Sequence, residues 1–146
     1  MTYPLAFSTW GKEEVEAIKR VIDTDMYTMG KHVKQFEQEF ATMFGSPHAV
    51  MVNSGSSANL LMLSLLKWKY KLTGDIIVPV VGWATTYFPI TQNGFRINFV
   101  DVDPDTWHID VSKIEAAITP DTCAIMAVNL LGNSCDYNKI LELCEK

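Results

Sequence analysis

Apolar residues recur at steps of three and four along the first fifty residues, and this spacing predicts two amphipathic helices. The first covers residues 13–23, where apolar side chains share one face and acidic residues occupy the first turn. The second follows Gly30 and ends at Gly45, a suitable residue for a helix C-cap. Its apolar face is expected to pack in a core and consists of Val33, Phe36, Phe40, Met43 and Phe44.

From residue 49 onward, short apolar runs alternate with helical patterns. The expected elements are strand 49–53, helix 56–70, strand 76–79, helix 85–92, strand 96–100, helix 111–118, strand 123–129 and helix 137–145. Leucines on several faces of the helix 56–70 predict burial on more than one side. Such alternation is typical of parallel β-α-β units with right-handed crossovers. The pattern therefore predicts a three-layer α/β fold, with residues 1–146 forming a single domain.

Composition and charge narrow the possible functions. The chain has 146 residues, of which 48% are hydrophobic and 20% charged, as in ordinary globular proteins. A net charge of −5 argues against binding nucleic acid by phosphate neutralisation, and we interpret the basic cluster 67–71 as a solvated helix end. No apolar stretch approaches the ~20 residues of a membrane span, and the N-terminus lacks a signal pattern. We expect a cytoplasmic protein that binds neither nucleic acid nor membrane.

The residues that commonly bind metals are scattered. The three cysteines form no Cys-x-x-Cys pair, have no histidine at ligand spacing, and are expected to be reduced thiols in or near the core: Cys123, Cys135 and Cys144. The histidines at positions 32, 48 and 108 fall in different elements, and we expect structural roles for them. The sequence therefore predicts no metal site.

Three aspartates at positions 101, 103 and 105 suggest a metal or phosphoaspartate site at first sight. A calcium loop starting at Asp101 would need glycine at position 106 and glutamate at position 112, where threonine and serine stand. A phosphoaspartate nucleophile would be expected on the first strand, with threonine or valine in place of Asp105. We interpret the trio as a strand end followed by a Pro-Asp turn.

The serine-rich turn after residue 53 carries the clearest candidate chemistry. An apolar run ends at Asn53, and a helical pattern restarts after Gly55, Ser56 and Ser57. A helix N-terminus presents free backbone amides at the positive end of the helix dipole, where a phosphate fits. A serine N-cap that only satisfies its own helix is the alternative, and this segment alone does not decide between them.

Trp83 follows the apolar run 76–81, at the carboxyl end of a predicted strand. Ligands bind at such ends in open α/β sheets. A tryptophan after an apolar run is nevertheless more often a packing residue than a platform for a flat ligand. Gly82 before it and two threonines after it favour an open loop.

Four segments occur in an order that resembles the DegT/DnrJ/EryC1/StrS family of nucleotide-sugar enzymes: 53–59, 76–86, 99–103 and 129–133. The resemblance begins near Tyr3, reaches the last residue and spans less than half of a usual family member. It implies the N-terminal part of the large, cofactor-binding domain of an aminotransferase (type I) fold. It also implies the cofactor pyridoxal 5′-phosphate or its pyridoxamine 5′-phosphate form.

The resemblance assigns roles to individual residues. It implies that Gly55 and Ser56 bind the cofactor phosphate, with Ser57 and Asn59 as weaker candidates, and that Trp83 stacks on the pyridine ring. The family's acid–base lysine or histidine, and the aspartate that pairs with the pyridine nitrogen, would follow Lys146. We therefore expect no catalytic residue within this chain and no activity from the 146 residues alone.

Residues 129–133 lack the aromatic residue that sugar aminotransferases place before the glycine. They resemble the family branch that removes the 3-hydroxyl of a nucleotide-linked 4-keto-6-deoxy sugar, with glutamate as amino donor and a homodimer at full length. A sugar 4-aminotransferase of the same family is the alternative. A non-catalytic shortened partner, or a module that only binds a phosphate ligand, is the alternative of another class.

Overall fold

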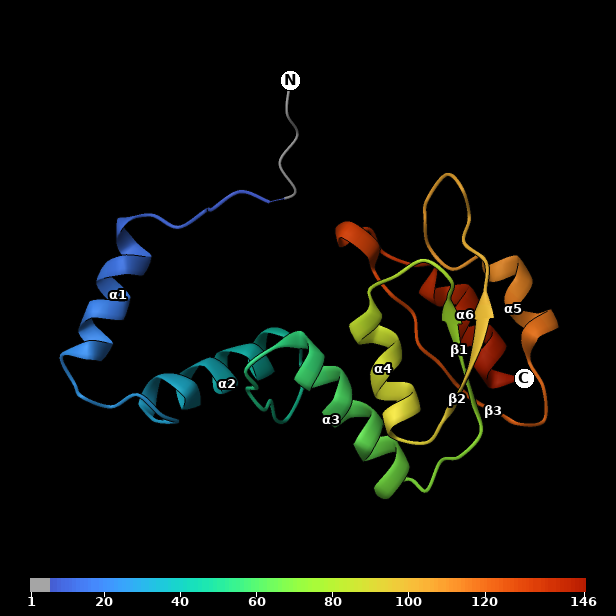
Figure 1. Ribbon diagram of the computed structural model, residues 1–146, viewed down its shortest axis with the longest axis horizontal. Coiled ribbons are helices and arrows are strands. Elements are labelled where there is room, and N and C mark those ends of the chain that lie inside the picture. Colours follow the sequence, from blue (N-terminus) through green and yellow to red (C-terminus); the bar gives the residue numbers. More distant parts are fainter. Residues whose placement is uncertain (1–5) are drawn as a thin grey trace. The chain divides into compact units, whose positions relative to one another are not determined.

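The computed structural model describes residues 6–146 and divides the chain into two compact units. Unit 1 comprises Met1–Met51, and unit 2 comprises Val52–Lys146. Helices dominate unit 1, whereas unit 2 combines helices with a parallel sheet (Figure 1).

Unit 1 contains the two helices that the apolar spacing predicts, α1 (Lys12–Ile22) and α2 (Lys31–Met43). At the start of α1, the Glu14 carboxylate accepts a 2.6 Å hydrogen bond from the Gly11 amide, which holds the pKa of Glu14 below its ordinary value. After α2, Gly45 adopts a φ of +62°, a left-handed conformation that favours glycine. The two helices and the terminating glycine are therefore confirmed.

The expectation that the phenylalanines of α2 are core residues is wrong. Phe36 and Phe40 lie 5.6 Å apart between ring centroids, and Phe40 and Phe44 lie 4.5 Å apart. All three stay 45–65% exposed, and Ala41 is the one buried hydrophobic residue in the described part of unit 1. A single row of aromatic rings along one helix buries its members only partly, because a core needs elements on several sides.

Unit 2 follows the predicted alternation of helices and strands. Its elements are α3 (Gly55–Trp68), β1 (Asp75–Pro79), α4 (Ala84–Gln92), β2 (Arg96–Val100), α5 (Val111–Ala117), β3 (Thr122–Ile125), the short 3₁₀ turn η1 (Leu130–Gly132) and α6 (Tyr137–Glu145). The strands form a parallel sheet in the order β2-β1-β3. The carboxyl ends of all three strands therefore meet at one edge, which we call the carboxyl edge.

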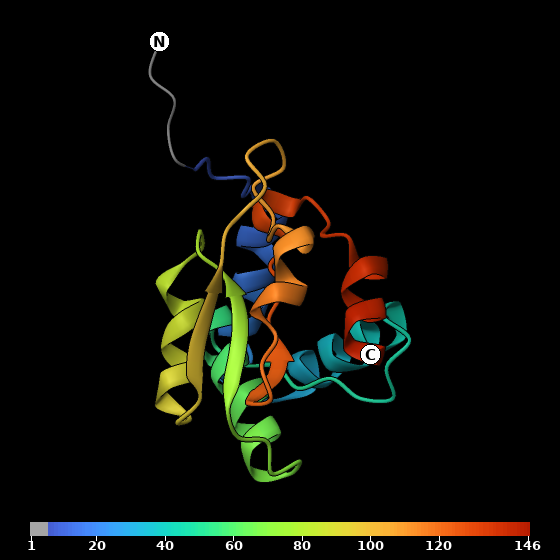
Figure 2. The same ribbon diagram turned by 90° about the vertical axis from the view of Figure 1, so that its right-hand side faces the viewer.

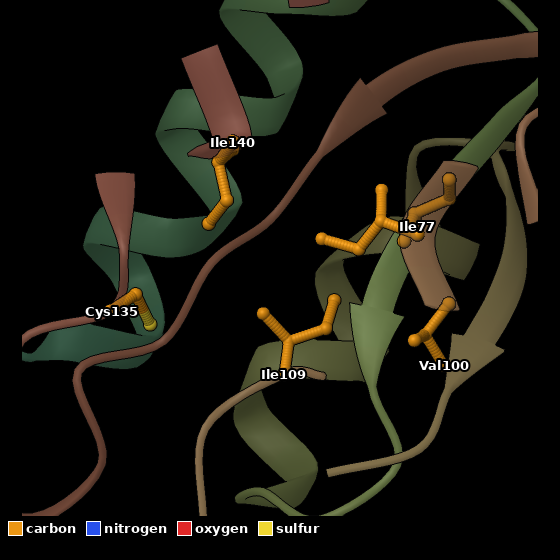
Figure 3. Packing of buried hydrophobic residues seen from close by; sticks show 6 residues of the cluster. Ile77, Val100, Ile109, Cys135 and Ile140 are labelled. Atoms are coloured by element: carbon orange, nitrogen blue, oxygen red, sulfur yellow. The ribbon is translucent and has the colours of Figure 1, made fainter. Parts of the chain in front are cut away.

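Alternate side chains of β1 enter two separate cores. Ile76 and Val78 pack with Leu63 of α3 and Ile90 of α4. Ile77 faces the other side, and Figure 2 shows α5 and α6 there. Figure 3 shows this second core, built by Ile77, Val100, Ile109, Ile114, Cys135 and Ile140. The predicted three layers, helix, sheet and helix, are confirmed.

Two strand predictions need correction. Residues 49–53 form no strand, and β3 ends at Ile125 instead of continuing to residue 129. A strand needs a hydrogen-bonded neighbour. The sheet in the described residues contains β2, β1 and β3, and none of these strands pairs with the apolar run 49–53. Composition alone cannot supply that partner.

Burial in unit 2 is also less complete than the sequence predicts. Leu63 is the one buried residue of α3, whereas Leu60, Leu61 and Leu65 are 40–50% exposed. Cys144 is exposed, which contradicts its expected place in or near the core, although Cys135 is buried and Cys123 is half-buried. All three thiols are free.

Candidate functional site

Hydrogen bonds between neighbouring polar side chains shape the serine-rich turn at the start of α3. Ser54 is the N-cap, and its Oγ accepts from the Ser57 amide at 3.2 Å. The Ser57 hydroxyl donates to Asn53 Oδ1 at 2.6 Å. Ser54 and Ser57 therefore serve the helix itself, whereas the exposed Ser56 makes no side-chain hydrogen bond in the described residues.

The space beside Gly55 in this turn is open. A Cβ built on Gly55 would meet no atom within 4 Å. The amides of Gly55 and Ser56 belong to the first helical turn, where backbone donors have no intrahelical partner. The helix dipole adds positive potential at the same place. The turn can therefore accept an anion such as a phosphate group.

The start of α4 lies beside the start of α3. The Asn59 side-chain amide on α3 donates to the Thr85 carbonyl oxygen in the first turn of α4 at 3.3 Å. Trp83 is the N-cap of α4, where its carbonyl oxygen accepts from the Thr86 amide at 2.8 Å. The Trp83 side chain is 72% exposed. Asn59 therefore links the two helix starts, one with free amides and the other with an open aromatic face.

The loop between β1 and α4 is held by a tyrosine. The Tyr87 hydroxyl donates to the Pro79 carbonyl oxygen at 2.9 Å, and burial raises the pKa of Tyr87 above its ordinary value. A Cβ on Gly82 would lie 2.5 Å from the Tyr87 hydroxyl oxygen. Glycine at position 82 thus permits the hydrogen bond that fixes the loop before Trp83.

The aspartates after β2 act as structural residues, as predicted for a strand end and turn. Asp103 Oδ1 accepts from the amides of Asp105 and Thr106, both at 2.9 Å. Asp101 accepts from the Val102 amide and pairs with the Lys113 ammonium at 3.3 Å. These contacts lower the pKa of Asp101 and Asp103. Residues 6–146 contain no group of three side chains that could hold a metal ion.

A second fixed loop follows β3 at the carboxyl edge. Asn129 Oδ1 accepts from the Cys135 amide at 3.0 Å and from the Tyr137 hydroxyl at 2.9 Å. Leu131, at the tip, is 96% exposed and has a φ of +54°. A left-handed leucine costs roughly 1–2 kcal/mol, which these bonds offset. Sequence reasoning missed this network, although an asparagine before a glycine-containing turn is a usable signal.

Comparison with known proteins shows the family of this chain. A model of the DegT/DnrJ/EryC1/StrS aminotransferase family matches residues 8–146. The chain belongs to this family. It is 51% identical over 149 aligned residues to the GDP-4-keto-6-deoxy-D-mannose 3-dehydratase of Yersinia pseudotuberculosis, covering 99% of this chain and 38% of that protein.

Solved structures agree with this membership of the DegT/DnrJ/EryC1/StrS family. The Escherichia coli GDP-4-keto-6-deoxy-D-mannose-3-dehydratase with bound hydrated pyridoxal phosphate matches at a TM-score of 0.91 and 48% identity, with 99% of this chain and 38% of that chain covered. A GDP-4-keto-6-deoxymannose-3-dehydratase with a trapped pyridoxal phosphate–glutamate geminal diamine matches at 0.90 and 49%, covering 97% and 38%. The chain thus spans about two fifths of the length of these relatives.

Within residues 6–146, no helix is both long and apolar enough to cross a membrane.

Proposed function

We propose that this chain supplies the phosphate-binding turn and the ring platform of an enzyme that uses pyridoxal or pyridoxamine 5′-phosphate. The enzyme removes the 3-hydroxyl of a nucleotide-linked 4-keto-6-deoxy sugar. One observation carries the proposal: the Asn59 to Thr85 hydrogen bond joins the start of α3, with its open turn at Gly55 and Ser56, to the start of α4, whose N-cap is the exposed Trp83.

The residues present fit the cofactor at both of its ends. A phosphate at Gly55 would receive backbone amides and the Ser56 hydroxyl, and its charge would complement the start of α3. Trp83 offers a flat face on which a pyridine ring can stack, at little cost in side-chain entropy. Ser57 contributes less to this proposal than the sequence implies, because its hydroxyl already donates to Asn53. Bound cofactor would supply a conjugated ring that withdraws electrons and so allows the sugar hydroxyl to leave.

In the proposed reaction, this chain binds and orients the cofactor, and it moves no proton. The Asp101 carboxylate after β2 is paired with the Lys113 ammonium on α5. The proposal places the acid–base residue outside residues 1–146, so these residues alone would show no turnover. It also includes glutamate as amino donor and a homodimer at full length, and the relative with trapped pyridoxal phosphate and glutamate supports the donor.

Transfer of an amino group to C4 of the same sugar is the second candidate, because the matching family model is described as an aminotransferase family. Leucine before Gly132, where sugar aminotransferases carry an aromatic residue, favours 3-dehydration. The identity of 51% to a 3-dehydratase supports the same branch.

Product analysis tests the reaction. The protein at its full natural length is incubated with cofactor, glutamate and GDP-4-keto-6-deoxymannose. A 3-deoxy-4-keto sugar is the expected product, whereas a 4-amino sugar would move the protein to the aminotransferase branch. Bound cofactor without turnover would favour a binding module, and no cofactor binding at all would refute the proposal.

Fluorescence tests the ring platform separately. If Trp83 stacks on the pyridine ring, cofactor should quench its emission, and Trp83→Ala should weaken cofactor binding more than Trp83→Phe. Trp68→Phe is the matched control, because Trp68 is 71% exposed at the opposite end of α3. Equal effects of the Trp83 and Trp68 substitutions would contradict stacking at position 83.

A further inference from the structure

We propose that Leu131 selects a 6-deoxy sugar by contacting its C6 methyl group. This inference rests on the proposed function, since it assumes that the sugar binds at the carboxyl edge. Leu131 would discriminate among sugars, whereas the phosphate turn and Trp83 are proposed to contact only the cofactor.

The position of Leu131 supports this role. Leu131 follows β3, and Trp83 follows β1, so both emerge at the carboxyl edge of a parallel sheet. The start of α3 lies there too, because Asn59 ties it to the first turn of α4. Cofactor phosphate, ring and sugar would then occupy one edge, with the sugar facing the loop after β3.

Hydrogen bonds on both sides of Leu131 indicate that the backbone of its loop is fixed. Asn129 Oδ1 accepts hydrogen bonds from the Cys135 amide and the Tyr137 hydroxyl, which lie after the tip of the loop. Within the loop, the Gly132 amide donates to the Asn129 carbonyl oxygen at 3.3 Å. The Cys135 thiol donates to the Val128 carbonyl oxygen at 3.1 Å. A left-handed, 96% exposed leucine at the tip gains nothing for the packing of unit 2. A loop held in this way displays its apolar side chain to a ligand.

The chemistry of the side chain identifies the part of the sugar that it fits. A hexose is polar at every ring position, and a 6-deoxy hexose carries one methyl group. Leucine gains by burying that methyl group, whereas a 6-hydroxyl placed against leucine loses hydrogen bonds to water. Apolar contacts that differ by one such group discriminate by about tenfold or more.

The test compares two ligands that differ only at C6, GDP-6-deoxymannose and GDP-mannose. We expect the protein at its full natural length, loaded with pyridoxal phosphate, to bind the 6-deoxy ligand about tenfold more tightly. Leu131→Asn should reduce that preference to about twofold, because asparagine tolerates the left-handed backbone but presents an amide. Cofactor affinity, measured by absorbance, should stay unchanged in this variant.

Controls separate the possible failures. Leu141→Asn replaces a 58% exposed leucine on α6 and should keep the full preference. Tyr137→Phe removes one hydrogen bond to Asn129 and should give an intermediate preference through a looser loop. An unchanged preference in Leu131→Asn would overturn this inference while leaving the proposed function intact. A protein that binds no pyridoxal phosphate would instead refute the proposed function.

Discussion

Both units contain helices with apolar residues at helical spacing, but they differ in how many of those residues they bury. In unit 1, α1 has no buried residue and α2 has only Ala41. In unit 2, helices on both faces of the sheet enclose Ile76, Ile77 and Val78, each at most 1% exposed. The difference shows that apolar spacing is sufficient to form a helix, whereas a buried core requires a third element to close it.

This contrast also bears on the candidate site. Trp83 and Ser56 are exposed, but both belong to elements whose opposite faces pack in the cores of unit 2. A rigid support of this kind can hold a binding group in place without ligand.

Shortening a buried side chain should show the largest difference in stability between variants of the two units. Ile77→Ala should lower the free energy of unfolding by about 3 kcal/mol, because Ile77 is fully buried between the sheet and α5 and α6. Phe40→Ala in unit 1 should cost less than about 1 kcal/mol, because that ring is 45% exposed. Urea unfolding followed by circular dichroism measures both. If Ile77→Ala leaves too little folded protein, Ile77→Val can be measured instead and should cost about 1 kcal/mol. Equal costs for Ile77→Ala and Phe40→Ala would contradict the difference in burial between the two units.

Two glycines with positive φ give a second matched pair. Gly74 has a φ of +118°, and an added Cβ would lie only 2.0 Å from the Asp121 carbonyl oxygen, which accepts from the Asp75 amide at 2.8 Å. Gly74→Ala should therefore disturb the junction of β1 and β3 and cost at least about 2 kcal/mol. Gly45→Ala, at a φ of +62° with no atom within 4 Å, should cost only about 1 kcal/mol. Thermal unfolding of the two variants measures the difference, and a Gly45→Ala cost as large as that of Gly74→Ala would show that backbone strain alone decides.

The phosphate turn gives the third pair, with affinity as the readout. Ser56→Ala should weaken binding of pyridoxal phosphate to the protein at its full natural length by about 1–3 kcal/mol, because a charge-assisted hydrogen bond is lost. Ser46→Ala is the control from unit 1, where the hydroxyl donates to the His48 carbonyl oxygen. Equilibrium titration followed by absorbance gives both values. Equal affinities for Ser56→Ala and the unmodified protein would remove the phosphate role from Ser56.

Sequence reasoning succeeded where structure depends on local spacing. The helices at residues 12–22 and 31–43, and the parallel strands of unit 2, follow from apolar periodicity and alternation. It failed for the apolar run 49–53, because a strand depends on a neighbour that no local pattern specifies. It also failed for the phenylalanines of α2, since burial depends on what covers a helix.

The candidate site divides in the same way. A helix N-terminus at Gly55 and a loop before Trp83 are local features, and both could be predicted. The Asn59 to Thr85 hydrogen bond joins residues 26 positions apart, so only the packing of α3 on α4 reveals it. The left-handed Leu131 likewise depends on hydrogen bonds from Asn129 to residues six and eight positions later. The cofactor roles of Gly55, Ser56, Ser57 and Trp83 stay predictions.

Acid sensitivity should show the smallest difference between the units. Asp110 in unit 2 accepts hydrogen bonds from the Ser112 hydroxyl and amide, and Glu14 in unit 1 accepts from the Gly11 amide. These contacts lower the pKa of Asp110 below its ordinary 3.8 and that of Glu14 below 4.5. Because the folded pKa is lower than the ordinary one, each carboxylate contributes its full stabilisation at pH values above its ordinary pKa. That contribution is lost as the pH falls through the lower, folded pKa.

Removal of each charge should therefore flatten the dependence of stability on pH below about pH 5. Asp110→Asn should flatten it more than Glu14→Gln, because Asp110, in the aspartate cluster 101–110, accepts two hydrogen bonds from Ser112 and pairs with the Lys113 ammonium at 3.2 Å. Glu14 accepts one hydrogen bond, from the Gly11 amide. Urea unfolding at a series of pH values measures the two slopes. A larger change in Glu14→Gln would show that the helix cap of unit 1, and not the aspartate cluster of unit 2, dominates the response to acid.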